Sequence, residues 1–444
     1  MPLCDLQAKI GRKEARLAVI GLGYVGLPVA CMFAQAGFDV LGIELRAECV
    51  QKVNSGSSPI EGNEPGLDEL LQEVVAAKKL RATADYQALR DRDVILICVE
   101  TPVDENNIPR YTALRNALSS LGPILMPGAL VIIESTIAPR TMDEVVLPLL
   151  ESSRAGKLNH NFYLGNCPER VMPGRLLKNL RTVSRVVGGM TPETAQVMVD
   201  LYRNIVQADL DPTDCITAEL VKTVENTYRD VQIAFANEVA LLCEAAGGDV
   251  WKVRELVNKS PGRQMHLPGA GVGGHCIPKD PWLLAYGAHD APLALRLIPA
   301  ARAINDSMPL HVVDLLRDAL QEAGRSVAGA RILVLGYAYL EDSDDARNSP
   351  SATLVQRLRE LGAQVVIHDP YVKEYQGNLL EMAAGCDAAV LMVRHQEYLS
   401  LSPSSLKSWL RLPVLVDGRH VWDPGQVSPA HFIFRSVGRG YKKA

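Results

Sequence analysis

The chain has 444 residues, of which 48% are hydrophobic and 22% are charged, and its formal net charge at pH 7 is −5. This composition is typical of a globular protein with two or three domains, and the slight acidity argues against a nucleic-acid or anionic-membrane surface. No apolar run reaches the length of a membrane span, and residues 1–15 lack the apolar core of a signal peptide. The nine cysteines are scattered without a Cys-x-x-Cys pair, which favours a reducing cytoplasm over a disulfide framework or a zinc ribbon.

The first predicted elements form a nucleotide-binding unit. Residues 16–20 predict a short strand, the sequence Gly21-Leu-Gly23-Tyr-Val-Gly26 follows at once, and an apolar helix then runs to Ala36. The first glycine makes the turn, the second lets a pyrophosphate approach the helix N-terminus, and the third lets helix and strand pack closely. With strand, turn and helix all in place, we expect a dinucleotide site here.

The second predicted strand, residues 39–43, ends at Glu44, which lies 23 residues after Gly21. An acidic residue at this distance typically hydrogen-bonds a ribose 2′-OH, which favours NAD as the cofactor. Arg46 could instead pair with a 2′-phosphate, so NADP is disfavoured without being excluded.

Further ligand-contacting residues are expected where other strands end, because open α/β sheets bind ligands at the carboxyl ends of their strands. These predicted strands are Val94–Val99, Ala129–Glu134 and Tyr163–Gly165. The predicted cofactor-binding residues are Gly21, Gly23, Tyr24, Val25, Gly26, Glu44, Arg46, Val99, Thr101, Ser135 and Thr136. Glu169, which follows the third of these strands, is either a ligand-binding carboxylate or an ordinary solvated one.

The middle of the chain is predicted to be helical. One long helix is expected from Thr217 to Gly247, a shorter one over Trp251–Asn258, and another from Trp282 to about Asn305. Lys222 and Asn226 are four residues apart on the long helix and therefore share a face. They either present a cation and an amide to an oxyanion or belong to an exposed polar stripe. This section is long enough to serve as a dimerisation surface.

The stretch Gly269–Pro281 surrounds Cys276 with glycines and prolines. A thiol on such a loop beside His275, Lys279 and Asp280 is suited to be a nucleophile of low pKa, although a buried structural cysteine would fit the same pattern. We expect no metal here, because adjacent residues rarely converge on one ion without a further Cys/His pair.

A second α/β unit is predicted beyond Gly324. Its first turn, Gly336 to Leu340, lacks the three-glycine pattern, so a second dinucleotide site of the same kind is not expected. Arg347 and Arg419 lie in predicted loops and could clamp a phosphate, or form ordinary surface salt bridges. The fold class is therefore α/β, with two Rossmann-like doubly wound parallel-sheet domains joined by a central all-helical domain. The expected parts are a leader (1–15), an NAD-binding domain (16–212), the helical domain (213–323) and a C-terminal α/β domain (324–444).

Six motifs occur together in an order that resembles the UDP-glucose/UDP-N-acetylhexosamine 6-dehydrogenase family, from about Arg16 to Trp422. They are Gly21–Pro28, Glu134–Thr136, Cys167–Arg170, Lys222 with Asn226, Gly273–Cys276 with Asp280, and Asp345–Pro350. Residues 225–238 and 266–276 are similar to the branch of the family that acts on UDP-N-acetyl-D-mannosamine. One departure is Leu340, where the family usually carries a lysine.

The resemblance implies that residues 324–444 form a UDP-binding domain, and that carbon 6 of a UDP-sugar is oxidised twice by NAD, from alcohol through aldehyde to carboxylate. It implies that Cys276 traps the aldehyde covalently, and that Lys222 and Asn226 stabilise the oxyanions. Glu169, Asp280 and a water held by Thr136 are then the candidates for proton transfer. The implied substrate-binding residues are Glu169, Arg170, Lys222, Asn226, Arg263, His266, Gly273, Arg347 and Arg419, with Arg263 acting across the interface of a homodimer.

Other hypotheses remain open from the sequence. UDP-N-acetylglucosamine could be the substrate, because gluco and manno forms differ only in the stereocentre next to the anomeric carbon, and UDP-glucose is a further alternative. A two-electron β-hydroxyacid dehydrogenase of the 6-phosphogluconate type would also carry a Lys and an Asn on a long helix, but it has no role for Cys276. An NAD-binding sensor or scaffold that has lost the chemistry is the non-enzyme alternative.

Overall fold

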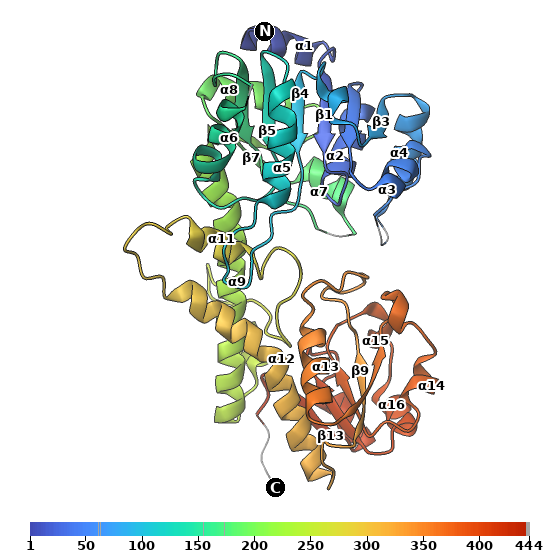
Figure 1. Cartoon of the computed structure of the whole chain (residues 1–444). Coiled ribbons are helices and arrows are strands. Elements are labelled where there is room, and N and C mark those ends of the chain that lie inside the picture. The colour runs from blue at the N-terminus through green and yellow to red at the C-terminus, as the bar shows by residue number, and fades with distance from the viewer. Residues whose placement is uncertain (61, 63, 154, 173, 441–444) are drawn as a thin grey trace. The chain divides into compact units, whose positions relative to one another are not determined.

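The computed structural model describes residues 1–60, 62, 64–153, 155–172 and 174–440. The chain divides into two compact units, shown in Figure 1. Unit 1 comprises Met1–Glu225 and Trp282–Ala291, and unit 2 comprises Asn226–Pro281 and Pro292–Ala444. The boundary between them falls within the long helix α9 (Cys215–Ala246), and the division into four parts made from the sequence stays a prediction.

The described strands of unit 1 form one sheet of eight, in the order β3-β2-β1-β4-β5-β6-β7-β8. All neighbours are parallel except β6 and β7, so the sheet departs from the expected all-parallel arrangement at that one pair. The order reverses between β1 and β4, which places the ligand-binding crevice of such a sheet beyond the end of β1. The strands are β1 (Arg16–Ile20), β2 (Asp39–Ile43), β3 (Leu80–Thr83), β4 (Val94–Ile97), β5 (Ala129–Ile133), β6 (Phe162–Asn166), β7 (Arg185–Gly189) and β8 (Leu210–Asp214).

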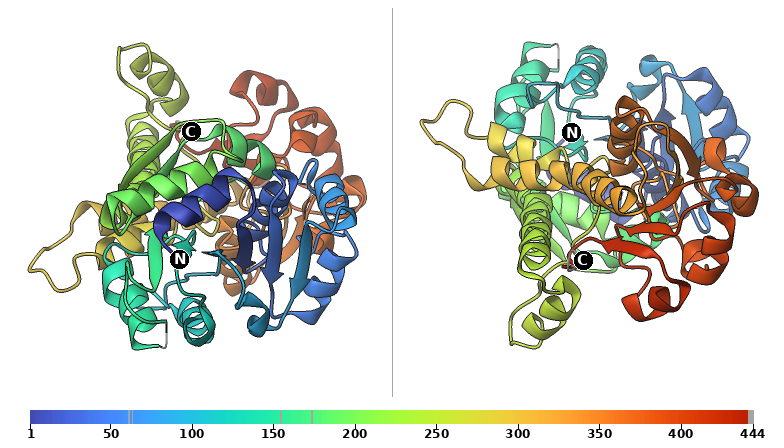
Figure 2. Two further views of the ribbon diagram at one scale, coloured as in Figure 1. Left: turned by 90° about the horizontal axis from the view of Figure 1, so that it is seen from above. Right: turned by 90° about the horizontal axis from the view of Figure 1, so that it is seen from below.

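Helices cover both faces of this sheet, which is why the central strands are continuous apolar runs. Every residue of β4 and β5 is buried. The helices are α1 (Leu3–Gly11), α2 (Gly26–Gln35), α3 (Ala47–Asn54), α4 (Leu67–Ala76), α5 (Thr112–Leu121), α6 (Leu147–Ser152), α7 (Leu176–Thr182) and α8 (Pro192–Tyr202). The expected leader thus contains helix α1, which lies along α8 (Figure 2, left) and buries Leu6 and Ile10.

Unit 2 contains a second Rossmann-like sheet. Its described strands are all parallel and run in the order β10-β9-β11-β12-β13. They are β9 (Arg331–Leu335), β10 (Gln364–His368), β11 (Ala388–Leu391), β12 (Val414–Asp417) and β13 (Ile433–Ser436). The helices that accompany this sheet are α13 (Pro350–Glu360), α14 (Leu379–Ala383), α15 (Gln396–Leu399), α16 (Pro403–Trp409) and α17 (Pro424–Val427).

The helical part of the chain adds α10 (Val250–Val257), α11 (Asp280–Tyr286) and α12 (Leu297–Glu322) to α9. The prediction of one helix from Trp282 to about Asn305 was wrong. Residues 287–296 are not helical, because Gly287 and Pro292 interrupt the pattern, and α12 continues well past Asn305. Ala236 and Ala240 of α9 share an apolar core with α12, since their small side chains allow close helix packing. None of the described helices has the length and apolar character needed to cross a bilayer.

Candidate functional site

The turn between β1 and α2 has the geometry that the glycine pattern predicts. Gly21 has a φ of +91°, and a Cβ there would lie 2.6 Å from the carbonyl oxygen of Cys98. A Cβ on Gly26 would lie 1.9 Å from the carbonyl oxygen of Gly21, so only glycine fits at either position. Next to Gly23, in contrast, nothing lies within 4 Å of a Cβ. Because no side chain caps the N-terminus of α2, its first N–H groups are available to a pyrophosphate.

Glu44 lies beside this turn, since the preceding Ile43 accepts the N–H of Gly21 at 2.8 Å. One carboxylate oxygen of Glu44 accepts the N–H of Leu22 at 3.4 Å, and the other accepts the N–H and Nε of Arg46, each at 3.1 Å. Burial opposes ionisation of Glu44, but the hydrogen bonds from Arg46 outweigh it, and the pKa of Glu44 is lowered. An ionised acceptor is therefore held where the sequence places the adenosine ribose.

The hydroxyl groups that follow β4 and β5 hold two loops together. Thr101 donates its hydroxyl to the carbonyl of Thr136 at 2.5 Å, and Ser135 donates its hydroxyl to the carbonyl of Val99 at 2.5 Å. These four predicted cofactor-binding residues thus lie side by side at the carboxyl ends of adjacent strands. Thr101 and Ser135 are buried, so their immediate role is to fix the loops.

A buried ion cluster occupies the same edge of the sheet. The guanidinium of Arg185, which is 1% exposed, lies 2.5 Å from Glu169 and 3.4 Å from Glu134. Glu134 also accepts the hydroxyl of Tyr202 at 2.6 Å, and the thiol of Cys98 lies 3.1 Å from it. Burial raises the pKa of Glu134, against the opposing effect of Arg185. The sequence analysis missed Arg185, although an arginine opening an otherwise apolar strand was a visible signal.

Glu169, predicted to bind substrate or act as a base, belongs to this cluster. Its second oxygen accepts the N–H of Arg170 at 2.7 Å, so both oxygens are occupied within the protein. Arg170 itself lies 2.8 Å from Glu225 and donates to the carbonyl of Ser184 at 3.0 Å. Lys222, in contrast, is only 7% exposed and has no hydrogen-bond or ion-pair partner among the described residues. A buried ammonium group without a partner is suited to an anion or a developing alkoxide.

In unit 2, the cysteine loop packs against the loop between β9 and α13. A Cβ on Gly273 would lie 2.6 Å from the carbonyl oxygen of Asn348, and a Cβ on Gly274 would lie 2.6 Å from the ring of Tyr339. Gly274 also donates its N–H to the carbonyl of Arg347 at 3.0 Å. Glycine is required at both positions, because any side chain would push the two loops apart.

Two side chains fix the beginning of the cysteine loop. Asn237 of α9 accepts the N–H of Gly269 at 2.9 Å. Arg419 donates to the carbonyl of Gly271 at 3.0 Å and to that of Met392 at 2.9 Å. Arg419 was predicted as a phosphate clamp, and in the structure it uses these donors to brace the loop.

Cys276 is exposed at the end of this loop, directly before α11. Its carbonyl accepts the N–H groups of Lys279 at 3.1 Å and Asp280 at 2.8 Å, which closes a tight turn. Burial, together with Lys279 and Arg347, lowers the pKa of His275 to about 4, so this neighbour is neutral at pH 7. His275 therefore adds no positive charge beside the thiol at pH 7.

Asn226 and Asp280, both predicted catalytic residues, are joined in the structure. The amide of Asn226 on α9 donates to the Asp280 carboxylate at 2.5 Å, and Lys279 lies 2.8 Å from the other oxygen. Asp280 is fully buried. The contact ties the first residue of α11 to α9 close to the exposed thiol.

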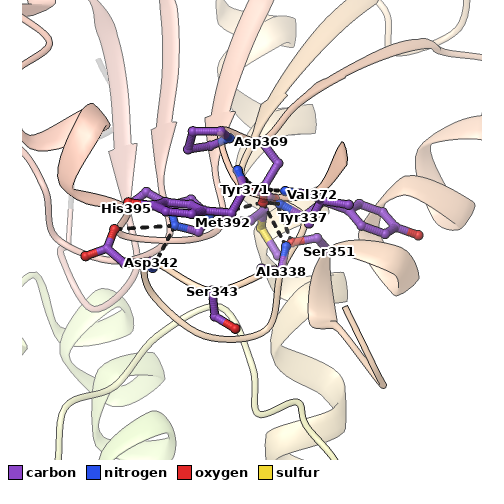
Figure 3. Close-up of polar contacts among 12 residues, drawn as sticks. Tyr337, Ala338, Asp342, Ser343, Ser351, Asp369, Tyr371, Val372, Met392 and His395 are labelled. Atoms are coloured by element: carbon purple, nitrogen blue, oxygen red, sulfur yellow. Dashed lines mark hydrogen bonds and ion pairs between the residues drawn. The ribbon is translucent and has the colours of Figure 1, made fainter. Parts of the chain in front are cut away.

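The loop that supports the cysteine loop is itself anchored at the ends of the strands of unit 2 (Figure 3). One oxygen of Asp369 accepts the N–H groups of Tyr337 at 2.6 Å and Ala338 at 2.9 Å. His395 Nε2 lies 3.1 Å from the same oxygen, and its Nδ1 accepts the N–H of Asp342 at 2.9 Å. Burial opposes ionisation of Asp369, but the hydrogen bond from His395 and those from the backbone lower its pKa. A carboxylate of the protein thus occupies the amides that would face a pyrophosphate in a dinucleotide site.

The remaining predicted substrate-binding residues differ in their exposure and in the contacts that they make within the protein. Arg347 is held by Asp345, with Nε 2.9 Å from one oxygen and Nη2 2.5 Å from the other. Arg263 is exposed and donates to a carbonyl of its own turn at 3.3 Å. His266 is partly buried, and burial, together with neighbouring arginines, lowers its pKa.

The structure adds Arg229, which the sequence analysis missed. It is exposed on α9, three residues after Asn226, and has no hydrogen-bond or ion-pair partner among the residues that the structure describes. It is near enough to both Tyr339 and His266 to affect their pKa values. Its spacing from Asn226 by about one helical turn was the signal available in the sequence. No group of three or more potential metal ligands lies together in the described ranges.

Comparison with known proteins gives a consistent match along the chain. The NAD-binding domain of the UDP-glucose/GDP-mannose dehydrogenase family matches residues 15–206, its central domain residues 216–307, and its UDP-binding domain residues 333–424. A UDP-N-acetyl-D-mannosamine dehydrogenase of Pyrococcus horikoshii is 41% identical over 425 residues, which cover 96% of this chain and 99% of that protein. The solved structure of the enzyme with that activity from the same organism has a TM-score of 0.91 to this chain at 41% identity, over 96% of this chain and 99% of that one.

Two further solved structures carry other sugar specificities. An NDP-N-acetyl-D-galactosaminuronic acid dehydrogenase from Methanosarcina mazei has a TM-score of 0.86 at 36% identity, over 99% of this chain and 98% of that one. A UDP-glucose dehydrogenase from Pyrobaculum islandicum has a TM-score of 0.86 at 27% identity, over 96% of this chain and 98% of that one.

Proposed function

Because the chain belongs to the UDP-glucose/GDP-mannose dehydrogenase family, and is thus an NAD-dependent UDP-sugar dehydrogenase, we propose that its substrate is a UDP-N-acetylhexosamine, specifically UDP-N-acetyl-D-mannosamine. The proposed reaction oxidises the C6 alcohol to the carboxylate with removal of four electrons. The observation that carries the proposal is the exposed thiol of Cys276 on a loop that glycines and buried side chains hold in place.

In the proposed mechanism, the glycine turn after β1 and Glu44 would hold NAD, which would supply the hydride acceptor for carbon 6 in both oxidations. Cys276, as a thiolate, adds to the carbonyl carbon of the aldehyde, and the resulting alkoxide takes up a proton to give a thiohemiacetal. Loss of the second hydride and of that proton leaves a thioester. A water molecule then attacks the thioester carbon, the carbon–sulfur bond breaks, and the carboxylate leaves with the thiolate restored. A covalently held aldehyde cannot diffuse away between the two oxidations.

The polar side chains have distinct proposed roles. Lys222 stabilises the developing alkoxide, because it is a buried ammonium group without a partner among the described residues. Asn226 acts as the amide donor while it holds Asp280. The base for proton transfer is drawn from Asp280, a water held by Thr136, and Glu169, which is paired with Arg185. Arg229 is the cation of unit 2 best placed to contact the sugar nucleotide, since Arg347 and Arg419 already have partners.

The test is the amount of NADH formed per mole of sugar nucleotide, with UDP-N-acetyl-D-mannosamine, UDP-N-acetylglucosamine and UDP-glucose compared. Wild type, Cys276→Ala and Cys4→Ala are assayed together, the last as a control because Cys4 is a second exposed thiol, on α1. We expect two NADH per UDP-N-acetyl-D-mannosamine for wild type and Cys4→Ala, and no carboxylate product from Cys276→Ala. One NADH per sugar would favour a two-electron dehydrogenase, and full turnover without the thiol would exclude the covalent mechanism. A preference for either other sugar would reassign the substrate.

We also propose that the enzyme is a homodimer formed through α9 and works in the cytoplasm. Five large apolar side chains of α9 are exposed at spacings of four and seven residues, which places them on one narrow face. They are Leu220, Val224, Tyr228, Phe235 and Leu242. A second copy of the same helix would cover this face, and Arg263 would then reach the partner's site. None of the nine cysteines, all of which lie in the described residues, forms a disulfide, which suits a reducing compartment.

A further inference from the structure

One side of α9 carries a stripe of polar side chains that holds both ends of the cysteine loop. Asn226, Asp230 and Asn237 are spaced by four and seven residues, which places them along one face of the helix. Asn237 accepts the N–H of Gly269, where the loop begins, at 2.9 Å. Asn226 donates to the carboxylate of Asp280, where the loop ends, at 2.5 Å. The loop is therefore fixed to a single helix at its two ends.

Asn237 is also the last member of a buried hydrogen-bond chain that begins on α12. Its amide donates to the side-chain oxygen of Asn305 at 2.9 Å. The amide of Asn305 donates to Asp230 Oδ1 at 2.7 Å and to the carbonyl of Asp230 at 3.0 Å. Arg302 donates to the same Oδ1 at 2.6 Å, and all four side chains are buried. The chain thus runs from an ion pair through two amides to the backbone of Gly269.

The carboxylate of Asp230 sets the direction of every donor in this chain. An ionised carboxylate only accepts hydrogen bonds, so Asn305 turns its NH₂ group toward Asp230 and its oxygen toward Asn237. Asn237 then turns its own NH₂ group toward Asn305, which leaves its oxygen for the N–H of Gly269. Reversing either amide would break two buried hydrogen bonds. Asn305 therefore acts on the cysteine loop through α9, by way of Asn237.

We propose that Asp230, Asn305 and Asn237 are positioning residues for the nucleophile Cys276, which they place by fixing the start of its loop on α9. The catalytic consequence rests on the proposed function. Hydride transfer from the alcohol does not use the thiol, so that step continues when the loop is displaced. Addition of the thiolate to the aldehyde requires close approach of sulfur and carbon, so that step slows and part of the aldehyde escapes.

The first measurement is amide hydrogen exchange in peptides that cover residues 269–276, without cofactor or sugar nucleotide, so it does not depend on the proposed function. Wild type, Asn305→Ala, Asn237→Ala and the double variant are compared. We expect exchange in each single variant to be about five- to tenfold faster than in wild type, as the loss of one neutral hydrogen bond provides. The double variant should exchange no faster than Asn237→Ala, because Asn305 acts only through Asn237. Multiplied effects in the double variant would overturn the proposed chain.

The second measurement is the ratio of NADH to carboxylate product, with semicarbazide present to capture free aldehyde. We expect a ratio of two for wild type, and a ratio above two for Asn305→Ala and Asn237→Ala with the semicarbazone of the sugar aldehyde as the additional product. A merely structural role would slow both oxidations together and leave the ratio at two, which would overturn the positioning role. If wild type oxidised none of the sugar nucleotides, the proposed function would fail, whereas the exchange measurement would still decide whether the chain fixes the loop.

Asn54→Ala is the matched control, because the Asn54 side chain also accepts one backbone N–H and donates to one carbonyl, both of Ala82 in unit 1, at 2.7 Å and 2.9 Å. We expect this variant to keep the loop exchange and the product ratio of wild type. Asn305→Ser serves if the alanine variant does not fold, and we expect the same results from it, since the shorter side chain cannot reach both Asp230 and Asn237. The proposal is overturned if neither Asn305 variant exchanges faster in the loop than Asn54→Ala.

Discussion

Asn226 on α9 donates a hydrogen bond of 2.5 Å to the fully buried carboxylate of Asp280, the residue that begins α11. The backbone N–H of Asp280 in turn bonds to the carbonyl of Cys276 at 2.8 Å. The two contacts connect the long helix to the thiol-bearing loop through a single aspartate. Asn226 is therefore both a candidate oxyanion donor and part of the support of the nucleophile.

Replacing Asn226 should weaken both stability and activity. In Asn226→Ala, one oxygen of the buried Asp280 carboxylate loses its donor, so we expect the free energy of unfolding to fall by about 1–3 kcal/mol, with a lower kcat. Urea unfolding and steady-state kinetics provide the measurement. Asn204→Ala is the matched control, because the side chain of Asn204 bonds only to carbonyls in the last turn of α8, the helix that it follows. A loss of stability as large in that variant would argue against a special role for Asp280.

The contribution of Arg185 to the stability of the fold should depend on pH. Arg185→Leu leaves Glu134 and Glu169 buried without their cation. Burial already raises the pKa of Glu134 in the wild type against the opposing effect of Arg185, so loss of the guanidinium raises that pKa further. Such groups destabilise the folded state at pH values above the unfolded pKa, and the loss disappears as falling pH protonates them. We expect a loss of about 3–5 kcal/mol at pH 8 and a clearly smaller loss at pH 5, measured by chemical unfolding. An equal loss at the two pH values would mean that lost packing, and not charge, accounts for the effect.

The free energy of unfolding of the wild type should fall at acidic pH because of His275. Its folded-state pKa is lowered to about 4 from the usual value of 6.5, so between pH 6.5 and 4 the unfolded chain binds a proton that the folded protein does not. Stability from this group is intact above pH 6.5 and falls as the pH drops through that window, by on the order of 2 kcal/mol. We expect His275→Gln to lose less stability than wild type between pH 7 and pH 4.5. If the unfolding free energies of wild type and His275→Gln changed in parallel with pH, the lowered pKa of His275 would be refuted.

The exposed apolar face of α9 should determine the oligomeric state. Phe235, a residue of this face, is 58% exposed, and a charge there would have to be buried in the proposed dimer. We expect Phe235→Asp to be monomeric by light scattering while wild type is dimeric. Leu380→Asp is the control, because Leu380 is a similarly exposed apolar residue, 50% exposed on α14. A dimer that survives in Phe235→Asp would exclude this face as the interface.

Arg229 should contribute to the binding of the sugar nucleotide. Its guanidinium is exposed and has no ion-pair partner in the described parts of the chain, so it can pair with substrate at little cost. We expect Arg229→Ala to raise KM for the sugar nucleotide about tenfold or more, with little change in KM for NAD. Arg357→Ala removes a guanidinium from an exposed pair with Glu360 on α13 and should leave both values near those of wild type. Unchanged KM in Arg229→Ala would remove this residue from the site.

Much of the fold could be predicted because its signals are local. The glycine turn at Gly21–Gly26, the apolar strands that follow it, and the long helix around Lys222 and Asn226 are all visible in the sequence, and all were confirmed within a few residues. The helix predicted from Trp282 to about Asn305 failed, because apolar periodicity continued across a segment that Gly287 and Pro292 break. The spacing of hydrophobic residues does not show whether a glycine or proline within the pattern ends the helix, because that outcome also depends on tertiary packing.

The sequence by itself determined the family, the nucleotide turn and the thiol-bearing loop, since glycines at fixed spacing and short motifs act through backbone geometry alone. Only the tertiary structure decided what the charged side chains do. Arg347 and Arg419, which looked available for phosphate, are held by Asp345 and by backbone carbonyls, and Arg185 pairs with two carboxylates from other parts of the sheet. The physical reason is that the partner of a charged group is set by contacts between residues far apart in the chain, and burial strengthens those contacts in a way that no local pattern records.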